Sequence, residues 1–145
     1  MNKKILAFLG IFAIVMIGYA YAADSADSLN NTLTISGINF TIPEGMTEDI
    51  AEEVVNETGA DENYTFVTNS KTLEDNENVV IITVATYDQN LTEDYINDIG
   101  EKTTINNITG YLEDQSFFAL FSYIQDNDLV IVTANDKNLI EEVLS

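Results

Sequence analysis

Val79-Val80-Ile81-Ile82-Thr83-Val84-Ala85 is the stretch that decides the fold predicted for this chain. It contains one hydroxyl and no charge, so a strand built from it presents apolar side chains on both faces. Strands of this kind lie inside a sheet and are covered on both sides. The stretch therefore predicts a central strand. Either helices cover both faces of its sheet or one face is kept for a partner, and we expect helices.

Four further strands are predicted downstream, in a meander. Asn106-Asn107 separates the first pair, and asparagine tolerates the positive φ of a tight hairpin turn. Gln125-Asp126-Asn127-Asp128 turns the chain between the second pair. The expected strands are 103–105, 108–112, 117–124 and 129–133.

A β-hairpin is predicted upstream, because apolar residues alternate with polar ones on either side of Ser36-Gly37. Pro43, the only proline, ends it. The alternating residues are Leu33, Ile35, Ile38, Phe40 and Ile42. Short strands are also expected at 64–67 and from Leu73.

Three helices are expected between and after these strands. The segment 48–57 places apolar residues four positions apart, behind a capping Thr47 and a first turn of acids. Thr92 caps a second helix that reaches Ile99, and Asp136 caps a third. Their apolar residues are Ile50, Ala51, Val54 and Val55; Leu91, Ile96 and Ile99; and Leu139, Ile140, Val143 and Leu144. This order predicts an α+β fold, a mainly antiparallel sheet of about six to eight strands with three helices packed on it.

The N-terminus has the three parts of an export signal. Asn2-Lys3-Lys4 is positive, 5–17 is apolar, and Ala20-Tyr21-Ala22 supplies the small residues that a signal peptidase reads. Cleavage is expected between Ala22 and Ala23. A retained membrane anchor is the alternative, because 5–23 as a helix would be roughly 28 Å long, just short of a hydrocarbon core.

The expected organisation is a signal peptide over 1–22, a flexible leader over 23–31 and a single acidic α+β domain over 32–145. All 25 carboxylates of the chain lie beyond Ala22 with three of its five lysines, which gives that part a formal charge of −22. Such a surface repels polyanions, so nucleic acid is excluded as a partner. We expect a secreted or cell-surface domain without a membrane span after cleavage.

The residue types that are missing exclude several chemistries. The chain has no Cys, His, Arg or Trp. Disulfides, Cys/His zinc sites and Ser-His-Asp triads are therefore impossible. No catalytic residue, metal ligand or cofactor site is assigned, and a small hydrolase that uses two carboxylates stays open as an alternative.

N-glycosylation sequons are the densest motif, with six Asn-x-Thr triplets. All of them are expected in the leader, in turns, at helix ends or on the polar side of a strand, where a glycan would not enter the core. The candidate acceptors are Asn30, Asn39, Asn56, Asn63, Asn90 and Asn107.

Two acidic turns are candidates for a hard cation such as Ca²⁺, which binds six to eight oxygens. One turn holds Asp88-Gln89-Asn90, Glu93-Asp94 and Asp98, and the other holds Asp126 and Asp128. Neither has the glycine and terminal glutamate of an EF-hand, so we interpret them as solvated turns and caps, with a calcium-stabilised module as an alternative. The aromatic run Phe117-Phe118, Phe121 and Tyr123 is interpreted as core rather than as a sugar-stacking surface.

The strand and turn Ile38-Asn39-Phe40-Thr41-Ile42-Pro43-Glu44-Gly45 resemble the start of PsbP-like domains. The later order of a long central strand, a helix, a strand with Gly110-Tyr111 and a closing helix is also similar to that family. The chain is similar as well to small exported proteins of unknown function from methanogenic archaea. The resemblance covers most of 32–145, and the chain departs from it in lacking the tryptophan often found after the turn.

What the resemblance implies is an antiparallel sheet between helices with a binding or assembly role. PsbP-like domains share no catalytic motif, so it implies no site residue. We therefore expect an exported, non-catalytic domain that binds an unknown protein or a component of the cell envelope.

Overall fold

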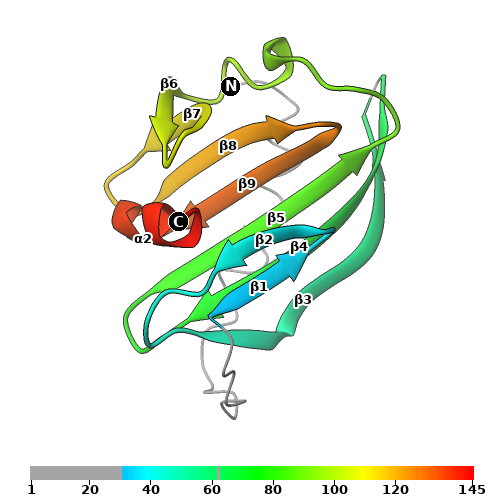
Figure 1. The fold of residues 1–145 in the computed structure, drawn as a ribbon. Coiled ribbons are helices and arrows are strands. Elements are labelled where there is room, and N and C mark those ends of the chain that lie inside the picture. Colours follow the sequence, from blue (N-terminus) through cyan, green and yellow to red (C-terminus); the bar gives the residue numbers. More distant parts are fainter. Residues whose placement is uncertain (1–30, 62) are drawn as a thin grey trace.

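The computed structural model describes residues 31–61 and 63–145 (Figure 1). These residues form nine strands, one 3₁₀ turn and one α-helix. The strands are β1 (Thr32–Ile35), β2 (Ile38–Thr41), β3 (Thr47–Ala60), β4 (Thr65–Glu74), β5 (Val79–Tyr87), β6 (Glu101–Ile105), β7 (Ile108–Asp114), β8 (Ala119–Gln125) and β9 (Asp128–Ala134). The turn η1 spans Glu93–Tyr95 and the helix α2 spans Lys137–Val143.

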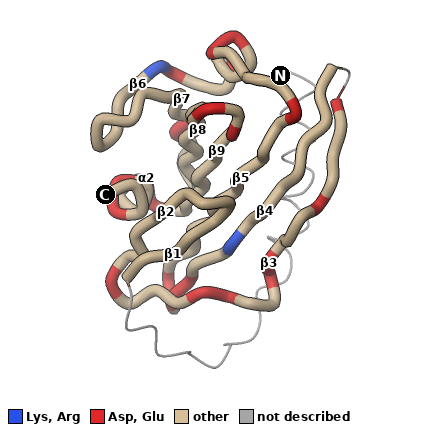
Figure 2. Tube along the Cα trace, turned by 45° about the vertical axis from the view of Figure 1, so that its right-hand side comes forward, with Lys and Arg blue, Asp and Glu red and all other residues tan. Residues whose placement is uncertain are grey.

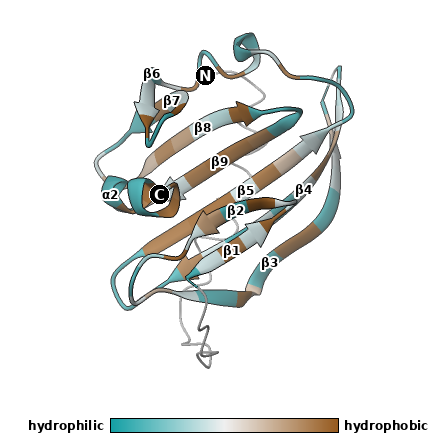
Figure 3. Cartoon of the chain, viewed as in Figure 1, coloured by the Kyte–Doolittle hydropathy of each residue, from teal (hydrophilic) through white to brown (hydrophobic). Residues whose placement is uncertain are grey.

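Seven strands make one antiparallel sheet in the order β3-β4-β5-β9-β8-β7-β6. Two meanders, β3 to β5 and β6 to β9, join where β5 pairs with β9, with Val84 opposite Val130. The apolar stretch that begins at Val79 is therefore an internal strand, as predicted. Figure 3 shows β5 and β9 as hydrophobic along most of their length.

One face of the sheet carries the larger core. The hairpin β1-β2 and helix α2 both lie on this face (Figure 1). Phe40 from the hairpin and Ile140 from the helix belong to one buried cluster with residues of β5 and β9, namely Val84, Val130 and Val132. Since α2 is short, it covers only the part of the sheet near β8 and β9.

The opposite face has a smaller core at one end. Leu91 and Ile96, from the connection that contains η1, cluster there with Tyr87, Leu129 and Ile131. This connection passes over the end of the sheet where β5 finishes (Figure 1). Helix coverage of this face, which we expected, is not what the described residues provide.

The prediction of an α+β fold with three helices is wrong, and the largest error is the helix expected over 48–57. These residues belong to β3, the edge strand that pairs with β4. The apolar residues of the expected stripe do not enter a core here, since Ile50 is 67% exposed and Val55 60% exposed. Two adjacent valines and a run of acids with no lysine inside 48–57 to pair with them also disfavour a helix.

The second expected helix is reduced to the single turn η1. Thr92 is extended, and its side chain makes no capping hydrogen bond within the described structure. Leu91 and Ile96, two of the apolar residues assigned to the expected helix, are both buried in one cluster. The prediction of a helix is therefore wrong here, although Leu91 and Ile96 are buried from a loop that contains one 3₁₀ turn.

The third helix and the hairpins are confirmed. The Asp136 side chain accepts a hydrogen bond from the backbone of Asn138 and caps α2. Asn106 and Asn107 both have positive φ, as a tight hairpin turn requires. The strands expected at 64–67 and from Leu73 are one strand, β4. No helix among the residues described is long and apolar enough to cross a membrane.

Candidate functional site

The sequon asparagines form the most consistent set of candidate residues. All five that the structure describes are exposed, and the sixth, Asn30, lies outside the described residues together with the expected cleavage site at Ala22 and Ala23. The five are Asn39, Asn56, Asn63, Asn90 and Asn107. Each can therefore carry a substituent without disturbing the core.

These five positions are spread around the edges of the domain. Asn39 lies on β2, where its Oδ1 accepts a hydrogen bond from Thr34 Oγ1 at 2.7 Å. Asn56 sits at an irregularity of β3 with a φ of 51°. Asn63 and Asn90 lie in connections at the same end of the sheet, because Gln89 bonds the carbonyl of Asn63 at 3.4 Å. Asn107 lies in the β6–β7 turn.

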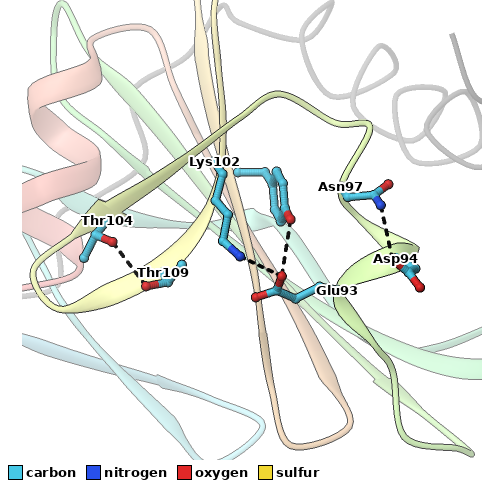
Figure 4. Close-up of polar contacts among 7 residues, drawn as sticks. Glu93, Asp94, Asn97, Lys102, Thr104 and Thr109 are labelled. Atoms are coloured by element: carbon cyan, nitrogen blue, oxygen red, sulfur yellow. Dashed lines mark hydrogen bonds and ion pairs between the residues drawn. The ribbon is translucent and has the colours of Figure 1, made fainter.

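The Asn107 sequon has a defined local geometry. Its threonine, Thr109, contacts Thr104 of the paired strand through their hydroxyl groups at 3.1 Å (Figure 4). Both threonines are exposed. Only Thr109 belongs to the sequon. A substitution at Thr104 therefore removes the hydrogen bond and keeps the sequon, whereas a substitution at Thr109 removes both.

The first acidic turn does not gather its carboxylates around one point. Lys102 Nζ binds Glu93 Oε2 at 2.7 Å, and the Tyr111 hydroxyl approaches the same oxygen at 3.5 Å (Figure 4). The Lys102 hydrogen bond and charge lower the pKa of Glu93. Asp94 instead bonds Asn97 at 3.3 Å.

Asp88, in the same turn, bonds the Thr65 hydroxyl at 2.9 Å. In the second acidic turn, Asp126 is exposed, whereas Asp128 is half-buried and its Oδ1 has no hydrogen-bond partner among the described residues. No group of three or more acidic side chains in the described part of the chain could hold a metal ion.

A cluster of tyrosines, which the sequence did not predict, connects the elements at one end of the sheet. The Tyr95 hydroxyl donates to the carboxylate of Asp61 and lies 3.2 Å from the Tyr87 hydroxyl. Tyr64 stacks edge-on against both tyrosines. Burial is the main reason that the pKa of Tyr87 rises to about 12 and that the pKa of Tyr95 is also raised. These neutral hydroxyls tie the β3–β4 turn to η1.

The aromatic run on β8 is largely core, as interpreted from the sequence. Phe121 is fully buried and Tyr123 is 3% exposed, both in the larger cluster. Phe117, in the turn before β8, is 70% exposed. The run therefore does not form a continuous aromatic surface.

A shallow groove of about 490 Å³ opens beside α2. It is lined by the connection after β2, the β6–β7 turn and the helix, including Glu44, Glu141 and Glu142. Asn106 Nδ2 donates to the carbonyl of Glu141 at 2.7 Å and fixes the turn against the helix. A lining of carboxylate and amide oxygens repels anions. Three segments far apart in sequence form this groove, so no local pattern could have predicted it.

Comparisons with known proteins found no match to this chain among family models, curated proteins or solved structures.

Proposed function

We propose that this chain is an exported, non-catalytic binding or cell-envelope domain that carries N-linked glycans. The observation that carries the proposal is the exposure of every sequon asparagine that the structure describes. Asparagines in a folded domain lie mostly at the surface in any case. The five described sequon asparagines share a second property, because none of them lies on an internal strand of the large sheet. Glycans placed in this way would be attached at the β1–β2 hairpin, at the edge strand β3 and in connections, and not on the internal strands of the sheet.

The strong negative charge and the export signal support the same assignment. The formal charge of −22 over 23–145 favours solubility outside the cell. Its partner would be a protein or another component of the envelope rather than nucleic acid. The PsbP-like resemblance remains a prediction, and it agrees with a binding or assembly role.

The experiment is a measurement of the N-terminus and the intact mass of the protein purified from its own host. We expect an N-terminus at Ala23 and a mass above that of the polypeptide from 23 to 145. Peptide mapping would then assign the modified asparagines. A mass equal to the bare polypeptide would refute glycosylation, and an intact 1–22 would refute processing.

A matched pair of variants tests the Asn107 sequon directly. Thr109→Ala removes both the sequon and the hydroxyl contact with Thr104, whereas Thr104→Ala removes only the contact. We expect the first variant, produced in the host, to lose the mass of one glycan and the second to keep it. Equal masses for the two variants would show that Asn107 carries no glycan.

A further inference from the structure

The five described sequons differ in how firmly the fold holds the residue between the asparagine and the threonine. In four of them this middle residue packs into a core. Phe40 is 2% exposed and Leu91 is 7% exposed, while Tyr64 and Ile108 are half-buried and pack against the two clusters. In the fifth, Asn56-Glu57-Thr58, all three residues are exposed. The Asn56 sequon is therefore the one that the core holds least.

Transfer of a glycan requires access to the asparagine amide and to the threonine two positions later. The reaction forms a bond between the amide nitrogen Nδ2 and the anomeric carbon of a sugar. The bond from that carbon to the phosphate of a glycosyl phosphate donor breaks, the phosphate leaves with the electron pair, and the amide releases one proton. A transferase must enclose the acceptor peptide in its own cleft, so the peptide must not already be paired and packed on every side.

The Asn39 sequon is held by strand pairing, by side-chain hydrogen bonds and by core packing. Asn39 pairs with Thr34 of β1, whose hydroxyl donates to Asn39 Oδ1 at 2.7 Å. The hydroxyl of Thr41, the threonine of this sequon, donates to the carbonyl of Ser145 at 2.9 Å. Phe40, between the two, is buried in the larger core. A transferase could therefore enclose this sequon only if β2 were released from these contacts.

The fold opposes transfer to Asn39 but not the product of that transfer. The side chain of Asn39 is exposed, and its hydrogen bond with Thr34 uses Oδ1, so Nδ2 is left as the attachment point. A glycan that is already attached when the hairpin forms would extend into solvent. Modification of Asn39 before folding is therefore compatible with the folded structure.

Asn56 lies on β3, which runs along the outer margin of the large sheet (Figure 2). It falls between the pairs that Val54 and Glu57 make with β4, where the register shifts, and it has no partner residue of its own in the ladder. Its backbone N–H donates to Asn69 Oδ1 at 2.8 Å, whereas the side chains of Asn56 and Thr58 make no hydrogen bond to described residues. No described strand pairs with the outer side of β3. A transferase can therefore bind this sequon from the margin of the sheet.

We propose that Asn56 is a glycan acceptor that the transferase can modify on the folded domain, whereas Asn39 can be modified only before β2 pairs and packs. This proposal rests on the proposed N-glycosylation of the chain. The two sites consequently report on different stages. The glycan on Asn39 is added before the domain folds, and the glycan on Asn56 can still be added afterwards.

The test compares the occupancy of each asparagine, measured by peptide mapping, in two samples of the protein from its own host. The first sample is purified from the unmodified strain. The second is purified from a strain that lacks the transferase, and is then incubated with detergent-solubilised membranes of the unmodified strain, which supply the transferase and its glycosyl phosphate donor. A synthetic peptide of 37–43 is added to the same incubation as a control, because it presents the Asn39 sequon without the fold.

We expect glycans on both Asn39 and Asn56 in the first sample. In the second sample Asn56 and the peptide should be modified, and the occupancy of Asn39 should be at least about tenfold lower than that of Asn56, because Phe40 must leave the core first.

The outcomes separate this proposal from the proposed glycosylation. Equal occupancy of Asn39 and Asn56 in the second sample, or an unmodified Asn56 there, would overturn the proposal. An unmodified peptide would overturn it too, because the fold would then not be what blocks Asn39. Glycans found only at other asparagines in the first sample would have the same consequence. A first sample without any glycan would instead refute the proposed glycosylation itself.

A matched pair of substitutions tests whether burial of the middle residue is the cause. Phe40→Ser removes the buried anchor of the hairpin, and Glu57→Ser makes the same replacement where the side chain is exposed; both keep the Asn-x-Thr pattern. Treated like the second sample, Phe40→Ser should gain at least about tenfold in the occupancy of Asn39, and Glu57→Ser should keep the occupancy of Asn56. An unchanged Asn39 in Phe40→Ser would overturn the proposed cause. The comparison of the two wild-type samples needs no variant, so it decides the proposal even if Phe40→Ser does not fold.

Discussion

Neighbouring carboxylates at the end of β4 lie in opposite electrostatic environments. Burial, together with the charges of Asp49 and Glu52, raises the pKa of Glu74. Hydrogen bonds from the backbone of Glu77 and from Asn78 lower the pKa of Asp75. The ionised form of Glu74 is therefore disfavoured in the folded protein, whereas the ionised form of Asp75 is favoured.

The two residues should consequently respond to neutralisation with opposite signs. The stabilisation from Glu74 is present below its unfolded pKa and is lost as pH rises through its folded pKa. At pH 7 its ionised form disfavours folding, so Glu74→Gln should raise the melting temperature slightly. The stabilisation from Asp75 is lost as pH falls, so Asp75→Asn should lower the melting temperature at pH 7. Thermal melts at pH 7 and at about pH 3, where both differences should shrink, would check this. Shifts of equal sign at pH 7 would contradict it.

The Tyr95 hydroxyl should stabilise the fold through its hydrogen bond to Asp61. Tyr95→Phe keeps the ring but removes the donor, so we expect a loss of about 1.5–3 kcal/mol in the free energy of unfolding, the range for a hydrogen bond to a charged group. Tyr64→Phe is the control, because its ring packs in the same cluster while its hydroxyl makes no hydrogen bond to the described residues. Denaturant titration of both variants would measure the difference, and equal losses would disprove the role of the hydroxyl.

At the scale of elements, β3 illustrates how an exposed sheet edge is protected. It is 14 residues long and carries register shifts between Asp49 and Val54 and between Val54 and Glu57. Bulges and charges of this kind discourage pairing with other chains. Lys71, on β4, binds both Glu48 and Glu53 and ties the irregular edge to the sheet. The edge is therefore held by backbone pairing with β4 and by these ion pairs, while Ile50 and Val55 stay exposed.

Strand β7 requires a glycine where it passes the core. A Cβ at Gly110 would lie 2.4 Å from the Ser122 carbonyl oxygen and 2.7 Å from the Phe121 ring. We expect Gly110→Ala to destabilise the protein by about 2–3 kcal/mol, because backbone on the neighbouring strand must move. Gly37→Ala, where the added carbon meets no described atom within 4 Å, should lose only about 1 kcal/mol through its positive φ. Chemical denaturation would measure the loss of unfolding free energy in each variant. If close packing at Gly110 were unimportant, Gly110→Ala would lose less than Gly37→Ala.

For the molecule as a whole, net charge is the main electrostatic influence on stability. Lys71, Lys102 and Lys137 each contact a carboxylate, but these three lysines cannot balance the 25 carboxylates of the chain. Salt should therefore stabilise the fold by screening repulsion. We expect the melting temperature to rise by several degrees between about 0.01 and 0.1 M NaCl, as the Debye length falls from about 30 to about 10 Å. A melting temperature that falls or stays constant would contradict this.

Comparing CaCl₂ with NaCl distinguishes general screening of the carboxylates from calcium binding at a specific site. At equal ionic strength, CaCl₂ should raise the melting temperature little more than NaCl, because Glu93 is already paired with Lys102 and Asp94 with Asn97. A large additional rise that saturates with calcium would contradict our interpretation of the acidic turns and favour a calcium-stabilised module.

The sequence by itself determined the elements whose signals are local. The alternation around Ser36-Gly37, the positive φ of Asn106-Asn107 and the cap at Asp136 act within a few residues, so the hairpins and α2 could be predicted. The exposure of the sequon asparagines in turns also followed from local polarity, as at Asn107.

Only the tertiary structure decided the state of 48–57 and the site geometry. Apolar residues at Ile50 and Val54 fit a helical stripe, but β4 supplies a pairing partner for the backbone, and Ile50 stays exposed. The tyrosine cluster and the groove beside α2 each combine segments that are distant in sequence. Their formation depends on which strands pair, and pairing is settled by the free energy of the whole sheet rather than by any local pattern.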